Sequence, residues 1–352
     1  MLRSLLSDDL PRSRWLTLML LAILIGLAVA PFLFPGAKSL NVAAKICVFI
    51  VLAASFDLLL GYTGIVSFAH TMFFGIGAYG VAIALTRMGP GWDSVAVGVA
   101  AGLVVAVVLA TVIGLFSLRV RTIFFAMITL AVASAFAILA SQLSDLTGGE
   151  DGLNYRLPTV LRTSFSLADG TLFGVRLNGR LVDYYIVYFS ALVLVLVLLR
   201  IVNSPFGSVL MAIRENPFRA EAIGYRTVLY RTIASCIAAA TAALAGVLLA
   251  LWSSQTNPDT TLSFDIMVDI LLMVVIGGMG TMYGAVVGAV LLVFAQNYLQ
   301  DLLAIANKAL AGVPLLANLF HPDRWLLWLG VAFILCVYFF PTGIVGRLRQ
   351  KR

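Results

Sequence analysis

The sequence predicts an all-α, polytopic integral membrane protein with about ten transmembrane helices, and three observations lead to this fold class. Of the 352 residues, 62% are hydrophobic and only 11% are charged, whereas soluble domains carry about 25% charged residues. The hydrophobic residues gather in runs of the length that spans hydrocarbon, which takes about 20 residues of helix. Lipid offers no hydrogen-bond partner to the backbone, and the runs are too long for barrel strands, so each is predicted to be a helix.

Ten apolar segments follow one another and are predicted to be the spans. The first follows Arg12 and Arg14 as a secretory signal would, but its apolar stretch exceeds a signal core of about 7–15 residues, so we expect it to be retained. The eighth and ninth are short and flank GGMG at 277–280, which predicts either one broken span or a tight helical hairpin. The segments are 15–34, 41–60, 66–86, 94–117, 122–143, 184–202, 230–252, 266–278, 281–299 and 325–341.

The distribution of Lys and Arg predicts the orientation, because basic residues in short loops stay on the cytoplasmic side. With ten spans and a cytoplasmic N-terminus, fourteen of the 23 basic residues lie inside, eight lie outside, and Lys45 lies within a span. Nine spans would place the basic C-terminal tail outside, so both termini are expected in the cytoplasm. The net charge of +7 fits anchoring against anionic lipid and is no signal for nucleic acid, since the basic residues are dispersed at span ends.

The chain is predicted to form one membrane domain, 1–352, whose two halves are joined by a long polar loop. The parts are the first five spans over 15–143, an outer loop over 144–183, the last five spans over 184–341 with a cytoplasmic loop at 203–229, and a basic tail over 342–352.

The outer loop is too polar for a span and carries two pairs that favour tight turns. These are DG at 169–170 and NG at 178–179, each beside short runs of alternating hydrophobicity. The pattern predicts a small β-hairpin. This hairpin is either an ordered loop and nothing more, or a docking edge for a partner protein.

The cytoplasmic loop at 203–229 is the polar interruption least suited to a membrane. Ser204 is a good helix cap, and Pro205 suits the first helical position, where its missing N–H costs nothing. From Phe206 onward, apolar residues recur at i, i+3, i+4 and i+7, which places one apolar stripe on a short helix.

A proline corner is predicted to split this loop into two short helices. Asn216-Pro217 ends the first helix and can start a second, which Gly224 ends. The pair either docks another protein or is an amphipathic element that rests on lipid headgroups. The predicted docking residues are Phe206, Arg214, Glu215, Asn216, Pro217, Glu221 and Gly224.

Small and polar residues within the spans form a second group. Small residues let helices approach closely, and glycine permits a helix break whose backbone faces a cavity. The stretch after Gly61 therefore either packs helices or lines a transport path. Asp57 is expected at a span boundary or on that path, because a charge in hydrocarbon is costly. The candidate pathway residues are Ser67, His70, Thr71 and Asp57, and the candidate structural glycines are Gly61, Gly64, Gly75, Gly77, Gly277, Gly278 and Gly280.

Four stretches, in order along the chain, resemble the branched-chain amino acid permease subunits of ABC importers, in their LivM-type branch. They are GYTGIVSFAH at 61–70 running into FFGIGAY at 73–79, LTGGEDGL at 146–153, the loop at 204–231, and GGMGT at 277–281 running on to Gly284. The likeness covers roughly 40–300. Urea permease subunits of similar importers share the same skeleton.

The resemblance implies a fold similar to that of ten-helix type II ABC importer permeases, in a bacterial inner membrane. It implies a second related permease subunit, two ATPase subunits, a periplasmic binding protein and surrounding lipid. The solute would be a branched-chain or other small neutral amino acid, with urea or a short amide as the alternative. Since the sequence holds no GxxxxGK[ST] motif, ATP and Mg are expected on the ATPase and no cofactor on this chain. The segment 204–224 of this loop would then fit a groove in the ATPase.

Two other classes compete with this interpretation. A stand-alone secondary transporter would carry carboxylates near span centres, and these are scarce here. A membrane-embedded enzyme would need a catalytic constellation, but the sequence has no HExxH or GxSxG motif. Its three cysteines, Cys47, Cys236 and Cys336, lie in apolar runs without metal-ligand spacing and are expected to be free thiols.

Overall fold

The structure is a computed structural model that describes residues 13–33, 36–117, 122–172, 175–309 and 318–350. Among these residues, ten helices are long and apolar enough to cross a membrane, which is the number that the sequence predicts. Some of the basic residues on which the predicted orientation depends lie outside the described residues: Arg3, Arg12, Arg119, Arg121, Lys351 and Arg352.

The long helices match the predicted spans in order and approximate extent. They are α2 (Arg14–Leu33), α3 (Ala37–Thr63), α4 (His70–Met88), α5 (Trp92–Ser117), α6 (Thr122–Gln142), α8 (Gly179–Val202), α11 (Thr227–Ser253), α13 (Phe264–Gly277), α14 (Met282–Ala309) and α16 (Trp325–Phe339). Short helices connect or follow them: α7 (Ser144–Thr147), α9 (Pro205–Glu215), α10 (Pro217–Ala222), α12 (Pro258–Thr261) and α17 (Gly343–Gln350), with 3-10 turns at Thr159–Leu161 and Pro322–Arg324.

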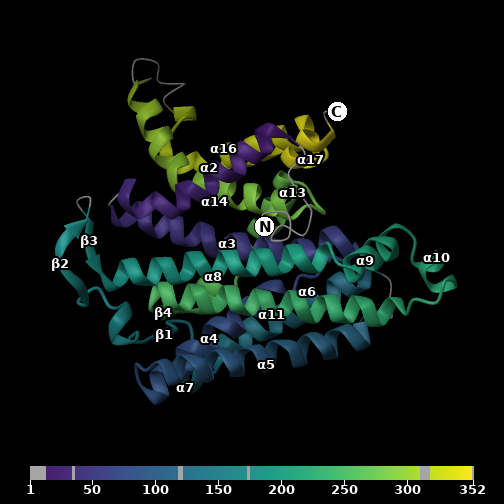
Figure 1. The fold of residues 1–352 in the computed structure, drawn as a ribbon, viewed down its shortest axis with the longest axis horizontal. Coiled ribbons are helices and arrows are strands. Elements are labelled where there is room, and N and C mark those ends of the chain that lie inside the picture. The colour runs from purple at the N-terminus through teal and green to yellow at the C-terminus, as the bar shows by residue number, and fades with distance from the viewer. Residues whose placement is uncertain (1–12, 34–35, 118–121, 173–174, 310–317, 351–352) are drawn as a thin grey trace.

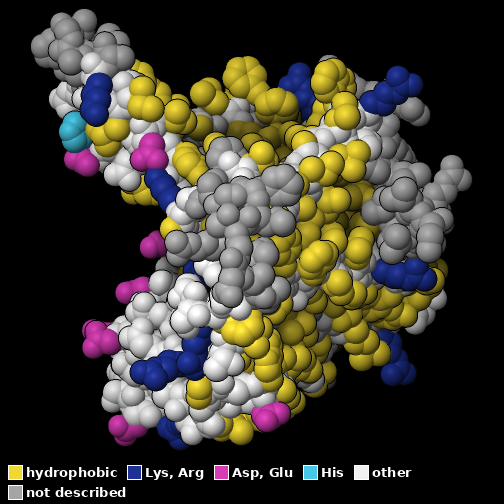
Figure 2. All heavy atoms as spheres, turned by 60° about the vertical axis from the view of Figure 1, so that its left-hand side comes forward, with side chains coloured by type: hydrophobic (Ala, Val, Ile, Leu, Met, Phe, Trp, Pro, Cys, Tyr) yellow, Lys and Arg dark blue, Asp and Glu magenta, His cyan; other side chains and the backbone are white. Residues whose placement is uncertain are grey.

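The bundle is built around α3, which packs against α8, α11, α13 and α14 and is almost wholly buried. Helices α4 and α5 pack on α11 from the other side, and α2 lies at the edge. The β2–β3 hairpin and the α9–α10 loop lie at opposite ends of the bundle (Figure 1). Figure 2 shows a broad face of apolar side chains between charged side chains at either edge, as expected of a surface that meets lipid.

The eighth and ninth spans form a tight helical hairpin. Helices α13 and α14 run antiparallel, and the Gln296 amide donates a 2.8 Å hydrogen bond to Asp269 Oδ1 across them. The turn contains Gly278 and Gly280, with φ of 119° and 79°, a conformation that side chains disfavour. Of the two arrangements that the sequence left open, the hairpin is therefore the one that the chain adopts.

The outer loop holds the predicted β-hairpin, but its turn is not where the sequence placed it. Strands β2 (Ser166–Leu172) and β3 (Val175–Asn178) pair antiparallel, so the DG pair at 169–170 lies within β2. Asn178 caps α8 instead of forming a turn, because its Oδ1 accepts a 3.2 Å hydrogen bond from Leu181 N. A second small pairing joins β1 (Leu153–Asn154) to β4 (Gln255–Thr256).

A tyrosine ladder on α8 attaches the first span. Pro31 lies inside α2 and has no N–H to give to the carbonyl of Leu27. The Tyr184 hydroxyl donates a 2.5 Å hydrogen bond to that carbonyl. Tyr185 and Tyr188 donate likewise to the carbonyls of residues 28 and 24, at 2.9 and 3.1 Å. The ladder thus supplies the donor that proline removed.

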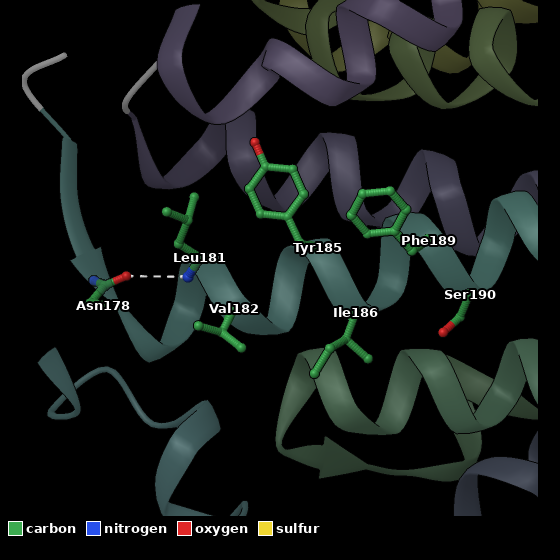
Figure 3. A pocket seen from close by; sticks show the side chains of 7 residues that line it. All are labelled: Asn178, Leu181, Val182, Tyr185, Ile186, Phe189 and Ser190. Carbon is green, nitrogen blue, oxygen red and sulfur yellow. Dashed lines mark hydrogen bonds between the residues drawn. The ribbon is translucent and has the colours of Figure 1, made fainter. Parts of the chain in front are cut away.

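An apolar groove of about 500 Å³ runs along the same part of α8 (Figure 3). In this view Tyr185 and Phe189 point to one side of the helix, whereas Val182 and Ile186 point to the other. The residues that line the groove are Asn178, Leu181, Val182, Tyr185, Ile186, Phe189 and Ser190.

We expect Tyr184→Phe to destabilise the protein by about 1–3 kcal/mol, the cost of a partly buried carbonyl left without a donor. Thermal unfolding of the purified protein measures this change. In a Pro31→Ala background, the restored N–H of residue 31 can bond to the Leu27 carbonyl, so the same substitution should cost much less. An equal loss of stability in both backgrounds would show that Tyr184 does not compensate for the proline.

Candidate functional site

The loop after α8 folds into two short helices that meet at a proline corner, as the sequence predicts. Asn216 leaves the helical conformation, with φ −155° and ψ 98°, and its Oδ1 accepts a 3.0 Å hydrogen bond from Arg219 N. Pro217 then occupies the first turn of α10. Ser204 occupies the predicted N-cap position of α9, although its hydroxyl donates to the Ile201 carbonyl and makes no capping hydrogen bond. Gly224, with φ 100°, directly follows the C-cap residue of α10 and ends this helix as predicted.

The apolar stripe of α9 packs onto the bundle. Leu210 and Ile213 are fully buried, and the ring of Phe206 stacks on Tyr230 of α11 with centroids 5.7 Å apart. Gly207 lies against the backbone of Val202, where a side chain would overlap it. The stripe is therefore covered by protein, and the two helices form a projection that is packed against the bundle.

Other apolar side chains of this projection are exposed. Phe218 is 82% exposed, Ile223 67% and Met211 46%. We call these three residues the exposed apolar patch. None of the three is among the docking residues predicted from the sequence, although an apolar residue that falls off the buried stripe of a short amphipathic helix is a usable signal. Exposed apolar side chains at a polar end of the bundle are a candidate surface for a partner.

Arg214 does not point away from the bundle with the exposed apolar patch but reaches back to the end of α3. Its Nη1 donates a hydrogen bond to the carbonyl of Gly61. A Cβ at Gly64 would lie 3.1 Å from Arg214 Cγ, and a Cβ at Gly280 would lie 2.9 Å from Arg214 Nη1. The glycines of two motifs that are distant in sequence therefore line the path of one arginine side chain.

Asp57, which lies within α3, contacts the same glycine-rich turn as Arg214. Its Oδ1 accepts a 2.8 Å hydrogen bond from Gly280 N, which fastens α3 to the turn of the α13–α14 hairpin. Gly61 lies between them, because a Cβ there would overlap both Asp57 Oδ1 and Gly280 N. We call the set Asp57, Gly61, Gly64, Arg214 and Gly280 the glycine junction. Asp57, expected at a boundary or on a path, is fully buried within it.

The predicted pathway residues lie close by but are packed. Helix α3 ends at Gly64, with φ 71°, and α4 begins at His70, so the break falls between two spans and not within one. His70 is buried, its Nε2 lies 2.8 Å from Ser55 Oγ, and its ring packs edge-on against Phe56. Ser67 and Thr71 are buried as well. Their contact with a transported solute stays a prediction.

The remaining candidate glycines lie where backbones approach each other. Gly77 of α4 faces the carbonyl of Ala243 in α11, and Gly75 faces Leu262. Within the hairpin, Gly277 lies against Gly284, and Gly278 lies against the start of α17. Small residues at these positions let the helices pack more closely than any side chain would allow.

The two candidate glutamates of the loop differ in their surroundings. Glu215, the last residue of α9, is exposed. Glu221 is also exposed, but its Oε1 accepts a 2.5 Å hydrogen bond from the hydroxyl of Thr227, the first residue of α11. Glu221 therefore fixes where α10 stands relative to α11.

Comparison with known proteins gives a consistent set of relatives. Residues 39–319 match the family model described as branched-chain amino acid transport system / permease component. The chain is 28% identical to the high-affinity branched-chain amino acid transport system permease protein LivM of Salmonella typhimurium, over 87% of this chain and 74% of that protein. LivM of Escherichia coli K12 is similar to the same extent. The permease protein LivH of Escherichia coli K12 is 26% identical over 84% of this chain and 91% of LivH. No solved structure matches the chain.

Proposed function

The chain belongs to the branched-chain amino acid transport system permease family, and we propose that it is the membrane-spanning subunit of an ATP-driven importer. The solute is a branched-chain or other small neutral amino acid, as the names of the LivM and LivH relatives suggest. The chain supplies the path through the membrane and hydrolyses nothing itself, while ATP and Mg bind to a separate ATPase subunit.

The observation that carries this proposal is the α9–α10 projection. A permease that responds to ATP hydrolysis in another protein needs a rigid element at its cytoplasmic face with an apolar contact for that protein. The exposed apolar patch supplies the contact, and the buried stripe of α9 supplies the rigidity. Arg214 then connects the projection to the ends of the spans through the glycine junction.

We further propose the assembly and its orientation. The relatives include two kinds of permease protein, LivM and LivH, which supports pairing with a second related permease subunit. Two ATPase subunits and a periplasmic binding protein complete the importer in the lipid of a bacterial inner membrane. The α9–α10 end carries basic side chains such as Arg219 and Arg226, and the preference of basic loops for the inside supports a cytoplasmic location for this end and for both termini.

Reconstitution in lipid vesicles tests the function. Vesicles that contain this chain, its partner permease and the ATPase should take up leucine only with ATP and the cognate binding protein. Leucine uptake should exceed urea uptake at equal concentration. Accumulation of leucine by this chain alone would overturn the proposal in favour of a stand-alone secondary transporter. Preferred uptake of urea or a short amide would show that the importer carries that solute and not an amino acid.

Charge reversal in the loop should uncouple transport. We expect Glu215→Arg and Glu221→Arg each to reduce leucine transported per ATP hydrolysed by about tenfold, equivalent to about 1.4 kcal/mol, because a positive charge replaces a negative one at the proposed contact. The complex should still assemble. The matched control is Asp323→Arg, an exposed acidic residue before α16, which should leave the ratio unchanged. Normal ratios of transport to ATP hydrolysis in both loop variants would show that neither glutamate takes part in the contact.

A further inference from the structure

The glycine junction contains a buried carboxylate oxygen without a partner. Asp57 is 0% exposed, and among the described residues nothing donates a hydrogen bond to its Oδ2. Its Oδ1 is bonded to Gly280 N. A buried ionised carboxylate is costly unless it is paired with a cation and fully hydrogen-bonded. The arrangement therefore leaves one strong acceptor position open in the interior.

The charge of Arg214 acts on this carboxylate, together with the backbone N–H groups of Gly280 and Thr281. The Nη1 of this arginine lies beside Gly280, the residue that holds Asp57 Oδ1, and donates to the Gly61 carbonyl. The two charged groups do not form an ion pair within 4.0 Å among the described contacts. A guanidinium has five donors in a planar fork that matches a carboxylate, so Arg214 has donors to spare for Asp57.

We propose that Asp57 is a second bonding position for Arg214, which moves between the Gly61 carbonyl and the Asp57 carboxylate as the importer works. This inference rests on the proposed function, because movement of the α9–α10 projection is what shifts Arg214. Asp57 is then a positioning residue. It binds the turn of the α13–α14 hairpin through Gly280 N, and it would bind the α9–α10 loop through the Arg214 side chain.

Glycines surround the two groups. The path of the guanidinium is lined by glycines at 61, 64 and 280, which offer no side chain to obstruct it. The turn itself contains Gly278 and Gly280 at positive φ, where the backbone is free to adjust. In the second position, an arginine–carboxylate pair forms two parallel hydrogen bonds. Because Oδ1 also holds Gly280, a pull on the carboxylate is transmitted directly to the hairpin.

A double-mutant cycle tests the inference in the complete importer in vesicles. The variants are Asp57→Asn, Arg214→Gln and the double variant, and the readout is leucine transported per ATP hydrolysed. Each single substitution should reduce this ratio at least tenfold. If the two groups act on each other, the double variant should lose no more than the worse single variant. Losses that multiply to a hundredfold or more, or single variants with the normal ratio, would overturn the inference.

Two further variants separate coupling from folding. Lys38→Gln with Asp301→Asn removes an exposed ion pair of 2.6 Å at the other end of α3 and should leave the ratio unchanged. If Asp57→Asn prevents assembly of the complex, the Arg214→Lys variant tests the inference instead. Lysine keeps the charge that the carboxylate needs, so it should recover at least half of the ratio lost in Arg214→Gln, and no recovery would overturn the inference. Absence of ATP-driven uptake in the wild-type complex would instead contradict the proposed function.

Discussion

Phe218→Ser is expected to weaken binding of the ATPase subunit by about 30-fold or more. Truncation of an aromatic side chain at the centre of an interface costs about 2–4 kcal/mol, and each 1.4 kcal/mol is a factor of ten. Phe218 is the most exposed member of the exposed apolar patch, at 82%, and it stands on α10 directly after the proline corner. Titration of the purified permease pair with the ATPase measures the affinity.

The matched control is Phe189→Ser. Phe189 has the same side chain and is 57% exposed, but it lies on α8 beside the groove of Figure 3, well away from the loop. This variant should bind the ATPase normally. Equal affinity of the Phe218→Ser variant and the wild type would show that the patch is not part of the contact, and an equal loss in both variants would point to general destabilisation.

Gly77→Ala is expected to have the largest effect on folding. A Cβ at this position would overlap the backbone of Ala243, so α4 and α11 would have to separate. No flexible side chain is present to give way. Overpacking of this kind costs about 3 kcal/mol or more when backbone must move. Thermal unfolding and the yield of monodisperse protein measure the loss.

Gly26→Ala serves as the control for this substitution. Gly26 is also a helical glycine, in α2, but no atom would lie within 4 Å of its new Cβ. Alanine is favoured over glycine in a helix by about 1 kcal/mol, so this variant should be as stable as the wild type or slightly more stable. A Gly77→Ala variant with wild-type stability would contradict the close approach of α4 and α11.

The spans could be predicted because their signal is local. Twenty consecutive apolar residues must form a helix in lipid whatever surrounds them, and all ten predicted segments correspond to helices. The proline corner at Asn216 was also predictable, because the signal is local: the Asn216 side chain caps α10 by accepting a hydrogen bond from the backbone of Arg219. The turn in the outer loop was not. Asn178 favours both a hairpin turn and a helix cap, and only the presence of α8 decides between them.

The glycine junction depends on contacts that no local pattern contains. Gly61 and Gly280 are separated by most of the chain, yet a side chain at either would touch the other. The sequence showed that both motifs are rich in glycine and predicted close packing, but not that they meet each other and Arg214. The direction of the Arg214 side chain likewise depends on how α9 packs on α3, α8 and α11, where Phe206 stacks on Tyr230.

Photo-crosslinking from position 218 tests the central claim, that the α9–α10 projection receives the ATPase. A photoreactive phenylalanine derivative is placed at Phe218, or at Phe189 as the control, in the assembled importer. Illumination should join the chain to the ATPase from position 218 and not from position 189. Absence of that crosslink from 218, in a complex that contains the ATPase and transports leucine, would contradict the account.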